Sequence, residues 1–182
     1  MKNKIFIIAL LCVSAGSFAQ VIIGPGKTAP TNSSVSLEFG TEEKGIVLPW
    51  VTTAAGVESA AQAQNPAQTV ADGTLIMDAT DKKVKLMRNG AWFDMTLERN
   101  GVVDTALQNS LSDRTEAKSS IGNPTSTPGI LVLEDTNKGM ILPQVASYLD
   151  ISSPAAGIVV FDTSKKLLCF FNGTQWTFWK PQ

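Results

Sequence analysis

The sequence predicts a mainly β protein, built from two tandem antiparallel β-meander modules that follow a signal peptide. Three observations predict this architecture: the chain matches itself in two blocks, short apolar segments alternate with turn residues, and two Asn-Gly pairs each stand between apolar segments. The predicted boundaries are residues 1–19 for the signal peptide, 20–97 for the first module, 98–120 for a polar spacer and 121–182 for the second module.

The first residues of the chain have the pattern of a secretory signal peptide. Lys2 and Lys4 give a positive start, Ile5 to Val13 form an apolar run, and Ser17 and Ala19 supply the small residues of a cleavage site. An uncleaved anchor is the alternative, but this run is short for a membrane span, which takes ~20 residues. We therefore expect cleavage after Ala19 and export across the inner membrane, to the cell surface, the extracellular space or the periplasm.

Cleavage would leave the mature chain with one cysteine. Cys12 lies inside the signal peptide, and a lipoprotein attached through it fits poorly, because the bulky Leu11 precedes it. Cys169 remains, and one thiol cannot form an intrachain disulfide, so the mature chain must rely on its apolar core or on association. The alternation of residues 167–171 places Cys169 on an apolar face, and an intermolecular disulfide through it stays open.

The composition excludes several classes of function. The chain has 182 residues, 16 acidic and 15 basic side chains, and no histidine. Without histidine there is no Ser–His or Cys–His nucleophile pair and no His-ligated metal. The balanced charge argues against nucleic-acid binding, which usually needs a basic excess. No segment after the signal peptide is long and apolar enough to span a membrane, so we expect no membrane span after cleavage.

Two blocks of the mature chain occur twice. Residues 37–51 match residues 131–145 at a shift of 94, so that Gly45 and Pro49 correspond to Gly139 and Pro143. The second block repeats at a shift of 84, which pairs Asp78 with Asp162. The first copy therefore carries ten extra residues, and we expect them to form an inserted loop within the Ala- and Gln-rich segment 52–70.

Each copy is predicted to form a three-stranded meander. The expected strands cover residues 74–77, 84–88 and 91–97 in the first copy and residues 158–161, 167–171 and 174–179 in the second. Asn-Gly between two apolar segments is the strongest short hairpin signal, because a type I′ turn needs a positive φ at both central residues. The Lys-Gly-x-x-Leu-Pro block adds a further strand, which its proline ends or places at a sheet edge.

The spacer between the copies is polar, and its sequence fits more than one structure. Val103, Leu107 and Leu111 are spaced by four, and Asp104 could cap a short helix from Leu107 to Lys118. Because this spacing covers only two helical turns, a loop or an extended connector is the alternative.

The repeated pattern resembles a module found in many secreted proteins of the Bacteroidota. The residues that carry the resemblance are Leu-Glu and Lys-Gly-x-x-Leu-Pro, followed by a turn aspartate and then by Asn-Gly-x-x-Trp. The signal ending at Phe18-Ala19-Gln20 is also similar to that group. The resemblance implies an adhesin-like, cell-surface or tail-fibre-like protein, and it implies no catalytic residue.

The repeated polar residues are predicted to be structural. Asp78 and Asp162 stand where a strand ends, so an Asx turn explains them better than a Ca²⁺ site, which needs six or more oxygen ligands. We expect no metal, no cofactor and no catalytic residue. The predicted structural turn residues are Gly45, Pro49, Asp78, Asn89, Gly90, Gly139, Pro143, Asp162, Asn172 and Gly173.

These observations favour an exported structural or adhesion protein that associates with itself as a fibre or filament subunit, or with other surface proteins. Small modules without disulfides often need a neighbour to complete their core. The alternative is a glycan-binding module that uses exposed Trp50, Trp92, Trp176 or Trp179, although packing in a core or an interface explains aromatic residues at these places better. A glycosidase that works with paired acids ranks last, because no acids are placed to converge.

Overall fold

The computed structural model describes residues 20–180, apart from residues 99, 107, 113, 115 and 116. The predicted signal peptide, residues 1–19, lies outside the described residues. Over these described residues the fold is mainly β, as predicted, and the strands form four sheets. No helix among the described residues is long and apolar enough to cross a membrane.

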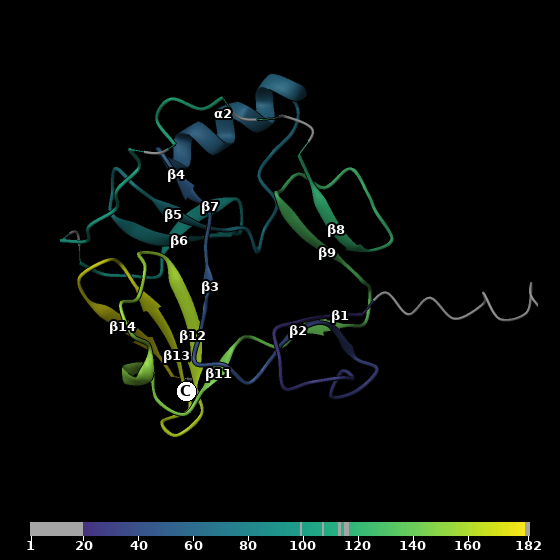
Figure 1. Cartoon of the computed structure of the whole chain (residues 1–182). Helices are drawn as coiled ribbons and strands as arrows, with labels where there is room; N and C mark the ends of the chain where they lie inside the picture. Colours follow the sequence, from purple (N-terminus) through teal and green to yellow (C-terminus); the bar gives the residue numbers. More distant parts are fainter. Residues whose placement is uncertain (1–19, 99, 107, 113, 115–116, 181–182) are drawn as a thin grey trace, which may run out of the picture.

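Two four-stranded ladders with the same register form the centre of the fold (Figure 1). The first contains β4 (Trp50–Val51), β5 (Leu75–Asp78), β6 (Lys83–Arg88) and β7 (Ala91–Asp94). The second contains β11 (Gln144–Val145), β12 (Ile158–Asp162), β13 (Leu167–Phe171) and β14 (Trp176–Trp179). Val51 lies opposite Asp78 in the first ladder, and Val145 lies opposite Asp162 in the second. The equal registers confirm the internal repeat.

Parallel pairing is the first departure from the predicted all-antiparallel modules. The meanders themselves are antiparallel, but β4 runs parallel to β5 and β11 runs parallel to β12. Each module also begins with a parallel pair. In the first module β1 (Val21–Ile23) pairs with β2 (Val35–Phe39), and in the second β8 (Ser119–Gly122) pairs with β9 (Leu131–Glu134).

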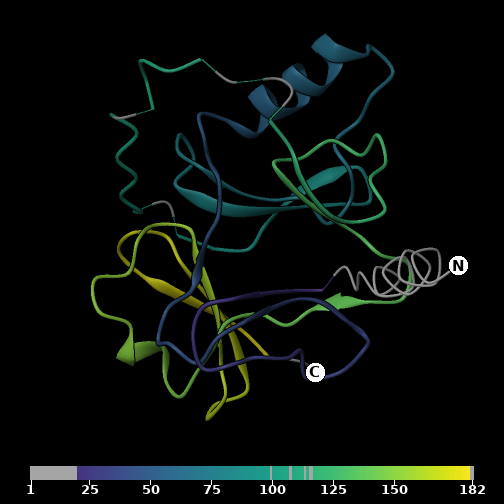
Figure 2. The ribbon, with the colours of Figure 1, turned by 45° about the vertical axis from the view of Figure 1, so that its right-hand side comes forward.

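The two modules exchange strands instead of lying apart on either side of a spacer. In the first module β3 (Ile46–Val47) pairs antiparallel with β12 of the second module, and β10 (Gly139–Met140) of the second module pairs parallel with β2 of the first. Figure 2 shows the modules interlaced: the purple start of the first module lies in the lower half with the yellow end of the second, and a green segment of the second lies in the upper half with the teal strands of the first. The exchange takes place at the Leu-Pro pair, because Pro49 separates β3 from β4 and Pro143 separates β10 from β11. Each proline ends a ladder, as predicted.

The segment inserted in the first module is a helix, not the expected loop. The helix α2 covers Ala54–Gln64, and Thr53 caps it by accepting a hydrogen bond from the Gly56 amide. Alanine and glutamine favour helix, and Ala61 packs with Met87 and Trp92 of the underlying sheet (Figure 1). The second module has a single 3₁₀ turn, Tyr148–Asp150, at the matching place.

The two Asn-Gly turns differ. Asn89 and Gly90 have φ values of 54° and 71°, which confirms the predicted type I′ turn. In the Asn172-Gly173 pair only Gly173 has a positive φ, so this turn is not type I′, and the last pair of the β13–β14 ladder is Phe171 opposite Trp176. The predicted second meander is present, but its turn does not repeat the geometry of the first.

The described part of the spacer holds separate turns in place of a helix from residue 107 to residue 118. The Ala117 amide donates to the Arg114 carbonyl, and nearer the start of the spacer the Asn109 amide donates to the Thr105 carbonyl. The Asp104 side chain accepts from the Ala106 amide, so it begins this turn as a cap would. Leu107 lies outside the described residues. The last two spacer residues already belong to β8.

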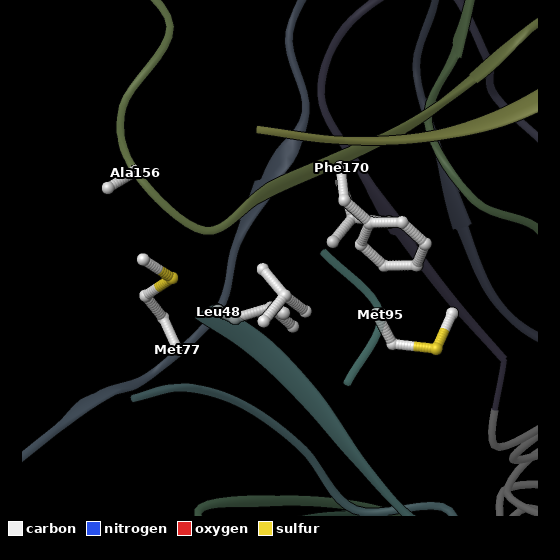
Figure 3. Packing of buried hydrophobic residues seen from close by; sticks show 7 residues of the cluster. Leu48, Met77, Met95, Ala156 and Phe170 are labelled. Carbon is white, nitrogen blue, oxygen red and sulfur yellow. The ribbon is translucent and has the colours of Figure 1, made fainter. Parts of the chain in front are cut away.

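One hydrophobic core joins the two modules (Figure 3). Leu48, Met77 and Met95 of the first module pack in it with Ala156 and Phe170 of the second. A second cluster lies within the second module around Cys169, which is buried as predicted. Burial raises the pKa of the Cys169 thiol. Neither module encloses the shared core alone.

Candidate functional site

The contact between the two modules is the candidate functional site, and Gly45 lies at its closest point. A Cβ on Gly45 would stand 2.5 Å from Cγ1 of Ile158 and 2.8 Å from the Val159 carbonyl oxygen. Atoms cannot approach so closely, so glycine is needed for β3 to reach β12. The predicted structural role of Gly45 thus has a definite cause, which is the close approach of two backbones.

Tryptophan side chains and a backbone amide close the same contact. The Leu48 amide donates to the Gly157 carbonyl at 3.1 Å, and the Trp50 indole N–H donates to the Ala156 carbonyl at 2.8 Å. From the other side, the Trp179 indole N–H donates to the Met95 carbonyl at 2.7 Å. Each of these bonds joins one module to the other.

Backbone bonds hold the second exchanged strand against β2. The Gly139 amide donates to the Ser34 carbonyl at 2.8 Å, and the Ile141 amide donates to the Leu37 carbonyl at 2.9 Å. Leu37 is 0% exposed. The edge of β2 is therefore fully covered.

Asp78 and Asp162 have the same structural role in the two modules. Each forms the predicted Asx turn and also accepts a hydrogen bond from the start of a helical segment. One oxygen of Asp78 accepts from the Thr80 and Asp81 amides, and the other accepts from the Ala54 amide at the start of α2. Asp78 also lies 3.7 Å from the Lys85 ammonium group. These donors explain the buried carboxylate without a metal.

Asp162 repeats this arrangement. One oxygen accepts from the Ser164 hydroxyl and the Lys165 amide, and the other accepts from the Tyr148 amide at the start of the 3₁₀ turn. Burial tends to raise the pKa of Asp162, but these hydrogen bonds outweigh it and leave the pKa below its ordinary value. Among the residues that the structure describes, no group of three or more His, Cys, Asp or Glu could hold a metal ion.

Asn172 ties the spacer to the second module. Its side-chain oxygen accepts from the Thr174 and Gln175 amides, and its side-chain nitrogen donates to the Glu98 carbonyl at 3.3 Å. Its own carbonyl accepts from the Val102 amide. The residue is thus a structural hub, where the sequence predicted only a turn residue.

Two glutamates close the long loops between the parallel strands, a role that the sequence analysis missed. Glu38 accepts from the Thr31 amide at 2.8 Å and from the Lys27 ammonium group. Glu134 accepts from the Ser120 hydroxyl and from the Thr125 amide at 2.9 Å. At the shift of 94 Glu38 corresponds to Val132 and Glu134 corresponds to Gly40, so the repeat did not point to these two glutamates.

These bonds lower the pKa of both carboxyl groups. The hydrogen bond from Lys27, followed by that from Thr31, lowers the pKa of Glu38 from 4.5 to about 2. Hydrogen bonds from Ser120 and then Thr125 lower the pKa of Glu134 from 4.5 to about 2. Since both folded-state values lie below the ordinary one, their stabilising effect is present above pH 4.5 and is lost as the pH falls toward 2.

We therefore expect the melting temperature to fall between pH 4.5 and pH 2, and to fall less in Glu38→Gln. At pH 7 the variant should melt below the wild type, because the Lys27 ammonium group loses its ionised partner. Thermal unfolding followed by circular dichroism at a series of pH values measures both effects. Parallel curves for the wild type and the variant would contradict the role of Glu38.

The four tryptophans proposed for glycan contact lie in three separate places. Trp50 and Trp179 pack on the core shared by the modules, Trp92 packs beneath α2, and Trp176 packs on the cluster around Cys169. Trp176 also contacts the Tyr148 ring at a tilt of 58°, with ring centroids 5.4 Å apart. All four are partly buried, and glycan binding through them stays a prediction.

A comparison with protein families gives one match that bears on this contact. The family model described as "Phage tail like trimerisation region" matches residues 120–181, which begin in β8 and run through β14. The matched segment is therefore the second module, and it is less than half of the chain. No curated protein matches the chain, and no solved structure matches it.

Proposed function

We propose that this chain is an exported structural protein whose modules drive self-association into a fibre-type homo-oligomer. The observation that carries the proposal is the similarity of residues 120–181 to a phage tail-like trimerisation region. The strand exchange supports it, because these modules already bind one another by completing each other's sheets. Such pairing transfers readily from one chain to another.

The remaining parts of the proposal come from the sequence. The signal-peptide pattern at residues 1–19 supports export, and the resemblance to secreted Bacteroidota proteins supports a place on the cell surface and a role in adhesion. A structural role without catalysis agrees with the lack of histidine and with the commitment of Asp78 and Asp162 to backbone donors. No cofactor is part of this proposal.

The test is the mass of the exported chain in solution. We expect light scattering after size exclusion to give a multiple of the chain mass at micromolar concentration, with three chains as the species that the trimerisation similarity favours. Mass spectrometry of the same sample should show cleavage after Ala19. A well-folded single chain at every concentration would contradict self-association.

A further inference from the structure

The contact between the two modules uses two strand edges that have unused counterparts elsewhere in the chain. The edge of β2 accepts β10, and the start of β12 accepts β3. By the repeat, the counterpart of β2 is β9 in the second module, and the counterpart of β12 is β5 in the first module. We call β3 and β10 the Lys-Gly strands, because the repeated Lys-Gly-x-x-Leu-Pro block forms both of them. Among the described residues, neither β9 nor β5 pairs with a Lys-Gly strand.

The first unused edge is that of β9. Leu131 stands where Leu37 stands in the first module, at the shift of 94. Leu37 is 0% exposed beneath β10, whereas Leu131 is 48% exposed and its neighbour Ile130 is 63% exposed. The Ser119 amide donates to the Ile130 carbonyl, so the amide and carbonyl of Leu131 point away from β8, toward the open edge.

The second unused edge is the start of β5. Gly157 precedes β12, and a Cβ on it would stand 3.0 Å from Cβ of Met77 in the other module. Its counterpart Gly73 precedes β5, and a Cβ on it would meet nothing within 4 Å. The first module covers the surface beside Gly157 of the second module. The corresponding surface beside Gly73 of the first module is uncovered.

The Lys-Gly strands show the same asymmetry. A Cβ on Gly45 would collide with β12, while a Cβ on its counterpart Gly139 would meet nothing within 4 Å. A small residue at position 139 therefore has no steric cause inside the chain. It has one if β10 also packs against another strand, as β3 does.

In each Lys-Gly strand, one set of backbone amides and carbonyls pairs within the chain and the other set is free to pair with another strand. In the first module the Leu48 amide faces β12, so by alternation Val47 faces away from it. In the second module Ile141, the counterpart of Val47, faces β2 and donates to Leu37. Each Lys-Gly strand thus pairs within the chain along one of its two edges. The edge that β3 uses against β12 corresponds to the free edge of β10, and the edge that β10 uses against β2 corresponds to the free edge of β3.

We propose that a second copy of this chain fills both open edges, head to tail. β3 of the second copy pairs with β9 of the first, with the Val47 amide donating to the Leu131 carbonyl. At the same time β10 of the first copy pairs with the start of β5 of the second, where Gly139 allows the close approach. The proposal rests on the proposed self-association and specifies its surface, by repeating between chains the contact already present within one.

This contact is heterologous, because the two copies use different surfaces. Leu131 and Gly139 lie on one side of it, and Val47 and Gly73 lie on the other. Each added copy presents the same open side again, so the contact leads to a ring if the rotation closes and to a filament if it does not.

The test uses one charged variant for each side. In Leu131→Lys the β9 edge is blocked, and in Val47→Lys the outer edge of β3 is blocked, while both side chains are already exposed, at 48% and 47%. We expect each variant alone to be a folded single chain by light scattering. An equimolar mixture should form a dimer and nothing larger, because one intact side of each kind remains.

One further variant tests the second half of the contact, and another is a control for the added charge. Gly139→Val should abolish assembly and leave the melting temperature of the single chain unchanged, whereas Leu149→Lys, at an exposed leucine of the 3₁₀ turn, should assemble like the wild type. Variants that still assemble, or a mixture that stays monomeric, would overturn the head-to-tail contact and leave self-association standing. A wild-type chain that never assembles would overturn both proposals.

Discussion

Gly45→Val is expected to separate the two modules and to lower the free energy of unfolding by about 3 kcal/mol, the upper end of the usual cost of overpacking. The cause is that the added Cβ would lie within 2.6 Å of Cγ1 of both Ile158 and Val160, and within 2.8 Å of a backbone oxygen that cannot turn aside. For a chain of this size the loss corresponds to about 6–12 °C in melting temperature.

Gly139→Val is the matched control, because it makes the same change at the corresponding position of the second module. Its Cβ meets nothing within 4 Å, so the melting temperature of the single chain should stay within about 2 °C of the wild type. Both variants are measured by thermal unfolding at a concentration where the chain is monomeric. Equal losses in the two would mean that the close approach of β3 to β12 is not what stabilises the chain.

Asp162→Ala is expected to lower the free energy of unfolding by about 3–5 kcal/mol, since each hydrogen bond to a charged acceptor is worth about 1.5–3 kcal/mol. The side chain is 0% exposed, and its removal leaves the Tyr148 and Lys165 amides without their acceptor. Asp162→Asn should lose less, because the amide oxygen still accepts from Lys165. Urea unfolding followed by tryptophan fluorescence measures both.

Asp150→Ala removes the same charge from an exposed position in the neighbouring 3₁₀ turn. It should change the free energy of unfolding by no more than about 0.5 kcal/mol, as is usual for surface substitutions. A comparable loss in Asp150→Ala would show that net charge, and not the hydrogen bonds of Asp162, determines the effect.

The sequence predicted the parts of the fold that depend on neighbouring residues. The meanders, the first type I′ turn and the buried Cys169 follow from alternation and turn chemistry, which act over a few residues. The internal repeat also predicted equal registers, because the same side chains face the same partners in both copies.

The parts that were missed depend on contacts between distant segments. β3 is only two residues long, and nothing near Ile46 in the sequence indicates that its partner is Val159. The function of Gly45 was likewise hidden, since a turn and a close approach both need glycine. Helix α2 was missed because its Ala- and Gln-rich segment carries a weak apolar pattern and interrupts the repeat.

The strand exchange also determines the order in which the chain can fold. β2 begins at Val35, and the strand that covers its edge begins at Gly139, so more than half of the chain must be synthesised between them. Until Gly139 is in place, the edge of β2 has no partner strand within its own chain. Before that, β2 presents to neighbouring chains the same kind of open edge that β9 presents in the finished protein.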